Sequence, residues 1–300
     1  MTIGDELNAV RVAAVGDLHV RSRTRGLLRP QFASLPENAD LLLLAGDLTN
    51  RGALSQAHTL ADEIAEIGVP IVAVLGNHDH DEGQESQIRA LLSSFGVHVL
   101  DGTTALLEVR GIRVGVAGIV GFDGGFGSDF DLWHAVRVDK RSDRKLTEAE
   151  RLGRALTALR DTQRADVRIA LTHYSPVRGT LEGEPREIIA CLGNELLGRT
   201  IDEAGADLAV HGHAHFGTER GRTVSGIEVR NVAQPVLGRP YAIYSLVPRR
   251  GARSAPGPAT GSVPGATTGS STEPHAAART LPAQATGPGA PAQNTAVSRP

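Results

Sequence analysis

Short apolar runs alternate with amphipathic stretches along the first 250 residues of the chain. The apolar runs are continuous rather than alternating, which is typical of strands buried on both faces. They predict strands at 10–16, 40–46, 70–75, 105–109, 112–119, 167–172 and 207–210. Helical spacing of the apolar residues predicts helices at 53–67, 85–95, 147–162 and 187–204. Strands that alternate with helices, followed by shorter strands to about residue 247, indicate an α/β fold with mixed sheets.

The composition changes near residue 249. The last 50 residues hold 8 of the chain's 16 prolines and contain no Ile, Phe, Tyr or Trp. Such a segment buries too little apolar surface to offset the entropy lost on ordering it. We therefore expect a folded domain at 1–248 and a disordered tail rich in Ala, Gly, Pro, Ser and Thr at 249–300.

Charge and composition exclude several classes of protein. A net charge of −3 and an aromatic fraction of 3% disfavour nucleic acid as a partner. A single cysteine, Cys191, excludes a disulfide framework and a thiolate metal cluster, and its helical context predicts a small core residue. The chain has neither an apolar run of membrane-spanning length nor the features of a signal peptide, so we expect no membrane association and a cytoplasmic location.

Aspartate, asparagine and histidine side chains gather immediately after the predicted strands. In an open α/β sheet, this edge is where ligands bind. Grouping these side chains without a cation would leave charge uncompensated, which a divalent metal would remedy. Imidazole and carboxylate without thiolate suit Mn, Fe, Zn, Co or Ni. The residues concerned are Asp17, His19, Asp47, Asn77, His78, Asp79, His173, His213 and His215.

The local spacing has a physical reason. In Asp17-x-His19 and His213-x-His215 the two side chains are two residues apart, so on extended backbone they point to the same side. Glycine precedes several of these residues, where the backbone must turn sharply or approach a ligand. One such pair alone is common in solvated loops, but a set repeated at five strand ends favours a shared site.

In this order, the motifs Asp17-x-His19, Gly46-Asp47, Gly76-Asn77-His78-Asp79, a single His173 after a strand, and Gly212-His213-x-His215 resemble the calcineurin-like metallophosphoesterase superfamily, in its bacterial cyclic-nucleotide phosphodiesterase-like branch. The resemblance covers roughly residues 10–234. It implies a four-layer α/β/β/α sandwich of two mixed β-sheets flanked by helices. It also implies two divalent metal ions, with Mn or Fe preferred and Zn, Co or Ni as alternatives.

Carried over to this chain, the resemblance assigns the metal ligands. The first metal would be held by Asp17, His19, Asp47 and His215, and the second by Asp47, Asn77, His173 and His213. Asp47 would bridge the two metals. His78 would act as a general acid or transition-state donor, and Asp79 would orient it. Metal-bound hydroxide would attack phosphorus in line.

The expected function is therefore hydrolysis of a small or nucleotide-type phosphodiester. Val20 after His19, the Asn50-Arg51-Gly52 sequence and the Asp at position 79 differ from the Ser/Thr protein phosphatase pattern. A phosphomonoesterase, a nuclease and a non-catalytic protein-interaction scaffold on the same fold stay open, although the intact ligand set favours an enzyme. For the Gly- and Phe-rich segment 120–133 we expect a lid that carries substrate selectivity, with a packed surface loop as the alternative.

Overall fold

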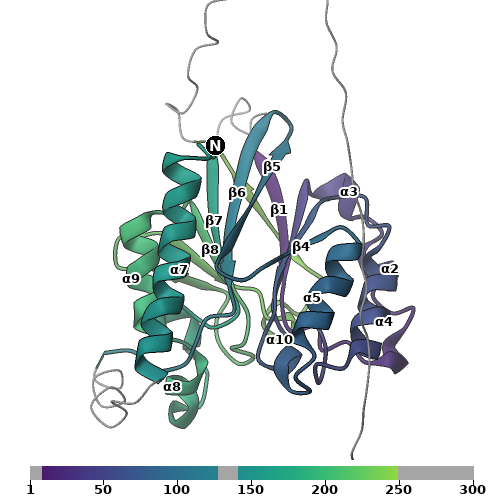
Figure 1. The fold of residues 1–300 in the computed structure, drawn as a ribbon, viewed down its shortest axis with the longest axis horizontal. Coiled ribbons are helices and arrows are strands. Elements are labelled where there is room, and N and C mark those ends of the chain that lie inside the picture. Colours follow the sequence, from purple (N-terminus) through teal and green to yellow (C-terminus); the bar gives the residue numbers. More distant parts are fainter. Residues whose placement is uncertain (1–8, 128–140, 249–300) are drawn as a thin grey trace, which may run out of the picture. The chain divides into compact units, whose positions relative to one another are not determined.

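The computed structural model describes residues 9–127 and 141–248, with the backbone alone for residues 141–146. Two mixed β-sheets form the centre of this part of the chain (Figure 1). The first sheet has the order β11–β1–β2–β3–β4 and the second the order β5–β6–β7–β8–β10–β9. The first sheet consists of β1 (Val10–Val15), β2 (Leu41–Ala45), β3 (Ile71–Val74), β4 (Val97–Leu100) and β11 (Ala242–Leu246). The second consists of β5 (Thr103–Val109), β6 (Ile112–Ile119), β7 (Val167–Thr172), β8 (Leu208–His211), β9 (Arg220–Arg222) and β10 (Glu228–Asn231).

The central strands of each sheet are parallel. Strands β1 to β4 run in one direction and only the edge strand β11 opposes them. In the second sheet, β6, β7, β8 and β10 are parallel, while β5 and β9 are antiparallel edges. The carboxyl ends of β1, β2 and β3 therefore meet at one edge of the first sheet, and those of β7 and β8 at one edge of the second.

Alternate residues of the buried strands face two different cores. One core lies between the sheets and includes Val12 and Leu43 from the first sheet with Val116 and Ile169 from the second. The neighbouring residues on each strand face outward onto helices. On the first sheet these helices are α4 (Leu54–Ile64) and α5 (Glu85–Ser94), and on the second α7 (Arg141–Asp161) and α9 (Glu195–Ala204). The expected four-layer sandwich is confirmed, and Figure 1 shows one helical layer on each side.

The remaining helices are short. They are α2 (Arg29–Phe32), α3 (Leu35–Asn38), α8 (Ile189–Leu192) and α10 (Gln234–Leu237). The single-turn 3₁₀ helices are η1 (Ser22–Thr24), η2 (His78–His80), η3 (Arg178–Leu181) and η4 (Arg186–Ile188). Among helices of the described residues, none combines the length and the apolar character needed to cross a bilayer.

Two helix predictions were wrong in their bounds. The helix expected at 187–204 is broken at Gly193, where a Cβ atom would lie 2.1 Å from the Ser175 carbonyl oxygen. Helix α9 begins after this break. Asn194 caps its first turn, because the Asn194 side chain accepts a hydrogen bond from the Leu196 amide. Helix α7 starts at Arg141 rather than Thr147. The prediction missed its first turns because they are polar and have no apolar residues at helical spacing. Strand β4 was not predicted, and the expected tail at 249–300 lies outside the described residues.

Candidate metal centre

The sharp turns after β1, β2 and β8 place several of the expected ligands at one edge of the sandwich. Six non-glycine residues of the described chain have positive φ, and four of them are Asp17, His19, Asp47 and His213. This left-handed conformation costs about 1 to 3 kcal/mol per residue and is found mainly where function requires it. The backbone is therefore strained where the candidate ligands lie.

Glycines beside these turns leave room for the ligand side chains. A Cβ atom on Gly76 would lie 2.1 Å from Asp47 Oδ1, and one on Gly212 would lie 2.3 Å from Asp17 Oδ2. A Cβ atom on Gly46 would collide with the His173 ring at 2.5 Å. The prediction that these glycines clear space around the site is confirmed.

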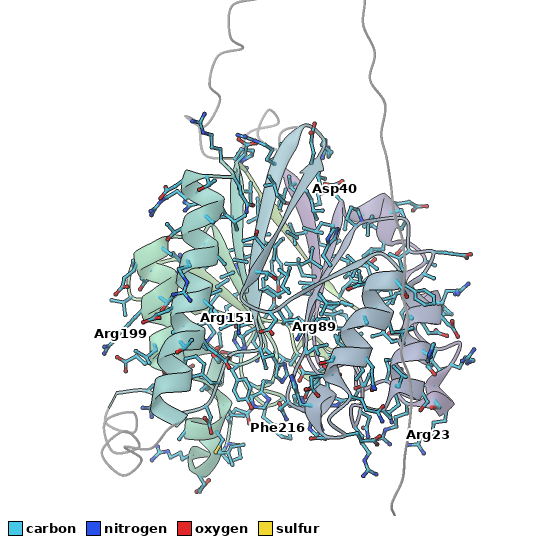
Figure 2. All side chains as sticks on the ribbon, in the orientation of Figure 1. Arg23, Asp40, Arg89, Arg151, Arg199 and Phe216 are labelled. Carbon is cyan, nitrogen blue, oxygen red and sulfur yellow. The ribbon has the colours of Figure 1, made fainter. Side chains whose placement is uncertain are left out.

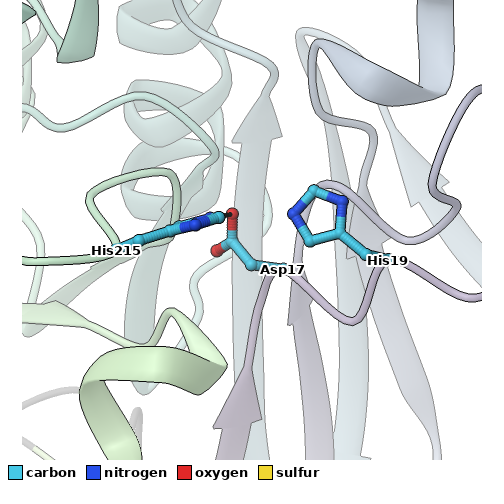
Figure 3. Close-up of side chains that lie close together, drawn as sticks. All are labelled: Asp17, His19 and His215. Atoms are coloured by element: carbon cyan, nitrogen blue, oxygen red, sulfur yellow. Dashed lines mark hydrogen bonds and ion pairs between the residues drawn. The ribbon is translucent and has the colours of Figure 1, made fainter.

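The first ligand group consists of Asp17, His19 and His215, whose ligand atoms all lie within 4.8 Å of one another. Figure 3 shows the Asp17 carboxylate between the two imidazole rings. Asp17 Oδ1 lies 2.9 Å from His215 Nε2, and the His213 amide donates to Asp17 Oδ2 at 2.9 Å. The hydrogen bond to Asp17 raises the pKa of His215, while burial lowers the pKa of His19.

The second ligand group consists of Asp47, His173 and His213, again within 4.8 Å. His173 Nδ1 donates to the Ala45 carbonyl oxygen at 2.9 Å, which leaves Nε2 facing Asn77 Oδ1 at 3.0 Å and Asp47 Oδ1 at 3.4 Å. Asn77 therefore lies beside this group, and its role as a metal ligand stays a prediction. Burial and the nearby His173 lower the pKa of His213 to about 3, which keeps His213 in the neutral form that binds metals.

Asp47 lies between the two groups. Its Oδ2 atom is 3.7 Å from His19 Nε2 and 3.9 Å from His78 Nε2, and its Oδ1 atom faces His173. Burial opposes ionisation of Asp47, but the charge and hydrogen bond of His173 outweigh it and hold the pKa of Asp47 well below its usual range. One carboxylate thus offers an oxygen to each side, the arrangement that a bridging ligand needs.

The residues present fit divalent cations. His19 Nε2 is buried and has no hydrogen-bond partner among the described residues, which is costly unless something else binds it. Burial would lower the pKa of His173, but Asp47 and Asp17 outweigh it and raise the pKa to about 9. A proton on His173 therefore supplies, in the metal-free protein, positive charge that a cation would replace. Nitrogen and oxygen donors without thiolate suit Mn, Fe, Zn, Co or Ni.

His78 faces this centre, but its hydrogen-bonded partner is Asp81 and not Asp79. His78 Nδ1 lies 3.0 Å from Asp81 Oδ2, with Nε2 directed to Asp47. The buried Asp79 carboxylate instead accepts hydrogen bonds from the backbone amides of Leu48, Thr49 and Gly76 and from the Thr49 hydroxyl. Asp79 therefore ties the loop after β3 to the loop after β2, at the residues that directly follow Asp47. The expectation that Asp79 orients the His78 ring was wrong.

Three nearby residues complete the surroundings of the site. His80 Nδ1 bonds to the Gly76 carbonyl oxygen, and His211 is buried with Nε2 2.8 Å from the Thr180 hydroxyl. Burial lowers the pKa of His211 to about 4, so this ring is neutral. Cys191 is exposed, in contrast to the expected core residue, and its carbonyl oxygen lies 3.3 Å from His213 Nε2. The break before α9 leaves Cys191 in a single helical turn instead of a long buried helix.

Six of the 14 residues of the expected lid, residues 128–133, lie outside the described residues. The preceding part packs against the body of the protein. Phe122 and Phe126 are buried, and the amides of Gly124 and Gly125 donate to the carbonyl oxygens of Ala190 and Gly193. Residues 121–127 thus form an anchored wall beside the site, and a lid role for the whole segment stays a prediction.

Among the described residues, three candidate metal groups lie at the strand ends of the sandwich, because His19, Asp47 and His78 form a further group that shares His19 with the first and Asp47 with the second. A two-sheet sandwich with such a centre defines the class of the protein. The sequence model for calcineurin-like phosphoesterases matches residues 10–217, and the chain belongs to this family. The family expected from the motifs is therefore confirmed.

Three relatives illustrate the range of similarity. A probable cyclic nucleotide phosphodiesterase of Synechococcus sp. is 35% identical over 89 residues, which cover 26% of this chain and 34% of that protein. An uncharacterized protein of Bacillus subtilis is 21% identical over 69% of this chain and 61% of that protein. The chain thus spans less than two thirds of the length of either curated relative. The crystal structure of phosphopantetheinyl hydrolase from Mycobacterium tuberculosis shares the fold, with a TM-score of 0.55 and 16% identity over 83% of this chain and 99% of that one.

Proposed function

We propose that this chain is a dinuclear-metal-dependent phosphodiesterase that hydrolyses a small or nucleotide-type phosphoester. The observation that carries the proposal is the position of Asp47 between two ligand groups, with one oxygen toward each. Asp17, His19, Asp47 and His215 would hold one cation, and Asp47, Asn77, His173 and His213 the other. Mn or Fe are the metals we expect first, as the family resemblance implies, and the imidazole and carboxylate donors also suit Zn, Co and Ni.

Two such cations would neutralise the charge that develops on the phosphoryl oxygens and lower the pKa of a water molecule at the site. The protein's own part is to hold the ligands in strained but fixed positions and to place a proton donor. His78 is suited to that role because Asp81 fixes its Nδ1 atom while Nε2 points to the centre. From Nε2 a proton would pass to the oxygen of the leaving alcohol.

The proposal is tested with protein stripped of metal by a chelator and reloaded with Mn²⁺, Fe²⁺, Co²⁺ or Zn²⁺. We expect hydrolysis of bis-p-nitrophenyl phosphate to require added metal and to exceed hydrolysis of p-nitrophenyl phosphate in kcat/KM. Preference for the monoester would identify a phosphomonoesterase instead. Absence of hydrolysis with all four metals would overturn the proposal and favour a non-catalytic protein-interaction scaffold.

A further inference from the structure

His213, a candidate ligand of the second group, lies on strained backbone. Its φ angle is 70°, in the left-handed region that most side chains avoid. A residue keeps this conformation only where its surroundings hold it there. The His213 amide donates to Asp17 Oδ2 at 2.9 Å, but Asp17 is itself a candidate ligand. Two buried side chains that belong to none of the candidate metal groups also act on the backbone around His213.

These side chains are those of His211 and Asn231, the last residues of the neighbouring parallel strands β8 and β10. The two residues are register partners in the sheet, and both are 0% exposed. His211 Nδ1 donates to the Gly212 carbonyl oxygen at 2.7 Å. Asn231 Nδ2 donates to the Ala214 carbonyl oxygen, also at 2.7 Å. The residues on both sides of His213 are therefore held by side chains of the sheet.

Each of the two carbonyl groups also accepts a backbone amide. The Gly212 oxygen receives the Ala214 amide at 2.8 Å, and the Ala214 oxygen receives the Gly217 amide at 3.4 Å. Both of these donors lie in the same loop, so they would move with it. His211 and Asn231 belong to strands, so their hydrogen bonds tie the loop to the sheet.

The His211 ring is held on its other side as well. A carbonyl oxygen can only accept, so the ring nitrogen that faces Gly212 carries a proton. Nε2 lies 2.8 Å from the Thr180 hydroxyl, which in turn lies 2.9 Å from Ser175 Oγ. Thr180 and Ser175 are also 0% exposed. A buried network in which every member has a partner favours a single orientation of the ring.

The far end of the same loop reaches the surface. The side chain of Phe216 is 73% exposed, and Figure 2 labels it in the lower part of the view. The Phe216 amide donates to Glu184 Oε1 at 2.8 Å. Phe216 itself contributes little packing, so hydrogen bonds to the rest of the protein hold this end of the loop.

We propose that His211 and Asn231 are positioning residues that hold His213, and through Ala214 also His215, in the conformation that binds metal. His211 acts on the peptide group before His213, and Asn231 on the one before His215. The sheet would then set the backbone before a cation arrives, so that metal binding need not order the loop. The inference rests on the proposed function, in which both loop histidines are metal ligands.

Two measurements test the inference, and neither depends on turnover. Hydrogen–deuterium exchange of the metal-free full chain reports on the backbone of residues 211–217, and titration with Mn²⁺ reports on the placement of the ligands. We expect His211→Leu and Asn231→Ala to speed exchange in that segment by at least about tenfold, because the hydrogen bonds to the sheet are lost. Both variants should bind Mn²⁺ at least about tenfold more weakly than the wild-type protein.

Three further variants separate positioning from general stability. His211→Asn keeps an amide donor where Nδ1 lies, so its Mn²⁺ affinity should stay within about threefold of wild type. Thr180→Val and Thr59→Val each remove the hydroxyl of a buried threonine. Only the Thr180 hydroxyl contacts His211, whereas that of Thr59 donates to the Ser55 carbonyl oxygen on α4. Both should lower stability toward urea, and only Thr180→Val should weaken Mn²⁺ binding.

Unchanged exchange in residues 211–217 of both His211→Leu and Asn231→Ala would overturn the inference, as would Mn²⁺ affinity within about threefold of wild type in both. If these variants do not fold, equal Mn²⁺ affinity of Thr180→Val and Thr59→Val has the same meaning. If the expected effects are found but the wild-type protein hydrolyses no phosphodiester, the inference stands and the proposed function fails. Hydrolysis with unchanged exchange and affinity in the variants has the opposite meaning, and a wild-type protein that binds no Mn²⁺ would overturn both.

Discussion

The two ligand groups lie on either side of the Asp47 carboxylate but differ in their access to solvent. In the first group, the side chains of His19 and His215 are 23% and 34% exposed. In the second group, the side chain of His173 is 0% exposed and that of Asp47 2% exposed. Asp17 of the first group is also buried, and His213 of the second is partly exposed, so the groups differ by one buried ligand. A cation in the second group would therefore have two buried ligands, Asp47 and His173, whereas one in the first would have only Asp17 buried and two histidines that solvent reaches.

We expect the largest loss of activity when Asp47, which lies between the two ligand groups, is substituted. Asp47→Ala should lower kcat/KM for bis-p-nitrophenyl phosphate by about 1,000-fold or more, because both cations lose a ligand. Metal content, measured by plasma mass spectrometry, should fall below one ion per chain. Asp62→Ala is the control, since Asp62 is a half-exposed aspartate paired with Arg25 away from the site. A variant that keeps both ions would show that Asp47 does not join the groups.

The next largest effect is expected for His78, whose substitution should lower kcat without loss of bound metal. His78→Ala should lower kcat by about 100- to 10,000-fold, the contribution of a placed proton donor, and leave the metal content unchanged. His58→Ala, an exposed histidine on α4, should change neither quantity. If metal content and kcat of His78→Ala fall together, His78 is a ligand and its assigned role is wrong.

A smaller loss of activity is expected when the space that Gly76 leaves for the Asp47 side chain is filled. Gly76→Ala would place a Cβ atom 2.1 Å from Asp47 Oδ1, so that carboxylate must shift. We expect kcat/KM to fall by about 10- to 100-fold, as when the support of a metal ligand is lost. Gly179→Ala is the control, because Gly179, like Gly76, has no positive φ, and a Cβ atom there would meet only Gly221 Cα at 3.9 Å. Equal activity of the two variants would mean that the site tolerates displacement of Asp47.

The smallest effect concerns the exposure difference itself. On addition of excess chelator to Mn²⁺-loaded protein, we expect two phases of metal loss, the faster from the first group. A tenfold ratio of rates would correspond to about 1.4 kcal/mol between the two barriers. His215→Ala should speed the fast phase alone. A single phase for the wild-type protein would remove the distinction between the groups.

The sequence alone predicted the polar residues of the site that come directly after a strand. Asp17, Asp47, Asn77 and His173 each come after a buried apolar run, and parallel strands bring those ends together. The alternation of strands and helices predicted an α/β fold with mixed sheets, whereas the four-layer order came from the family resemblance.

Contacts that depend on the geometry of a turn, or on residues remote in the chain, could not be predicted in the same way. The partner of His78 is decided by the turn of η2, which carries Asp79 under the loop after β2 and leaves Asp81 beside the ring. Asp101 meets Arg89 and Arg151 only because β4 leads it between two helices, and β4 was too short to predict. The break at Gly193 depends on Ser175, whose carbonyl oxygen lies close to Gly193 only in the folded chain.

The most direct test of the central claim is a crystal structure of the Mn²⁺-loaded protein with anomalous diffraction data. We expect two anomalous peaks per chain, one beside Asp17, His19 and His215, the other beside Asn77, His173 and His213, with Asp47 between them. A single peak, or two peaks without Asp47 between them, would show that Asp47 does not bridge two metal ions.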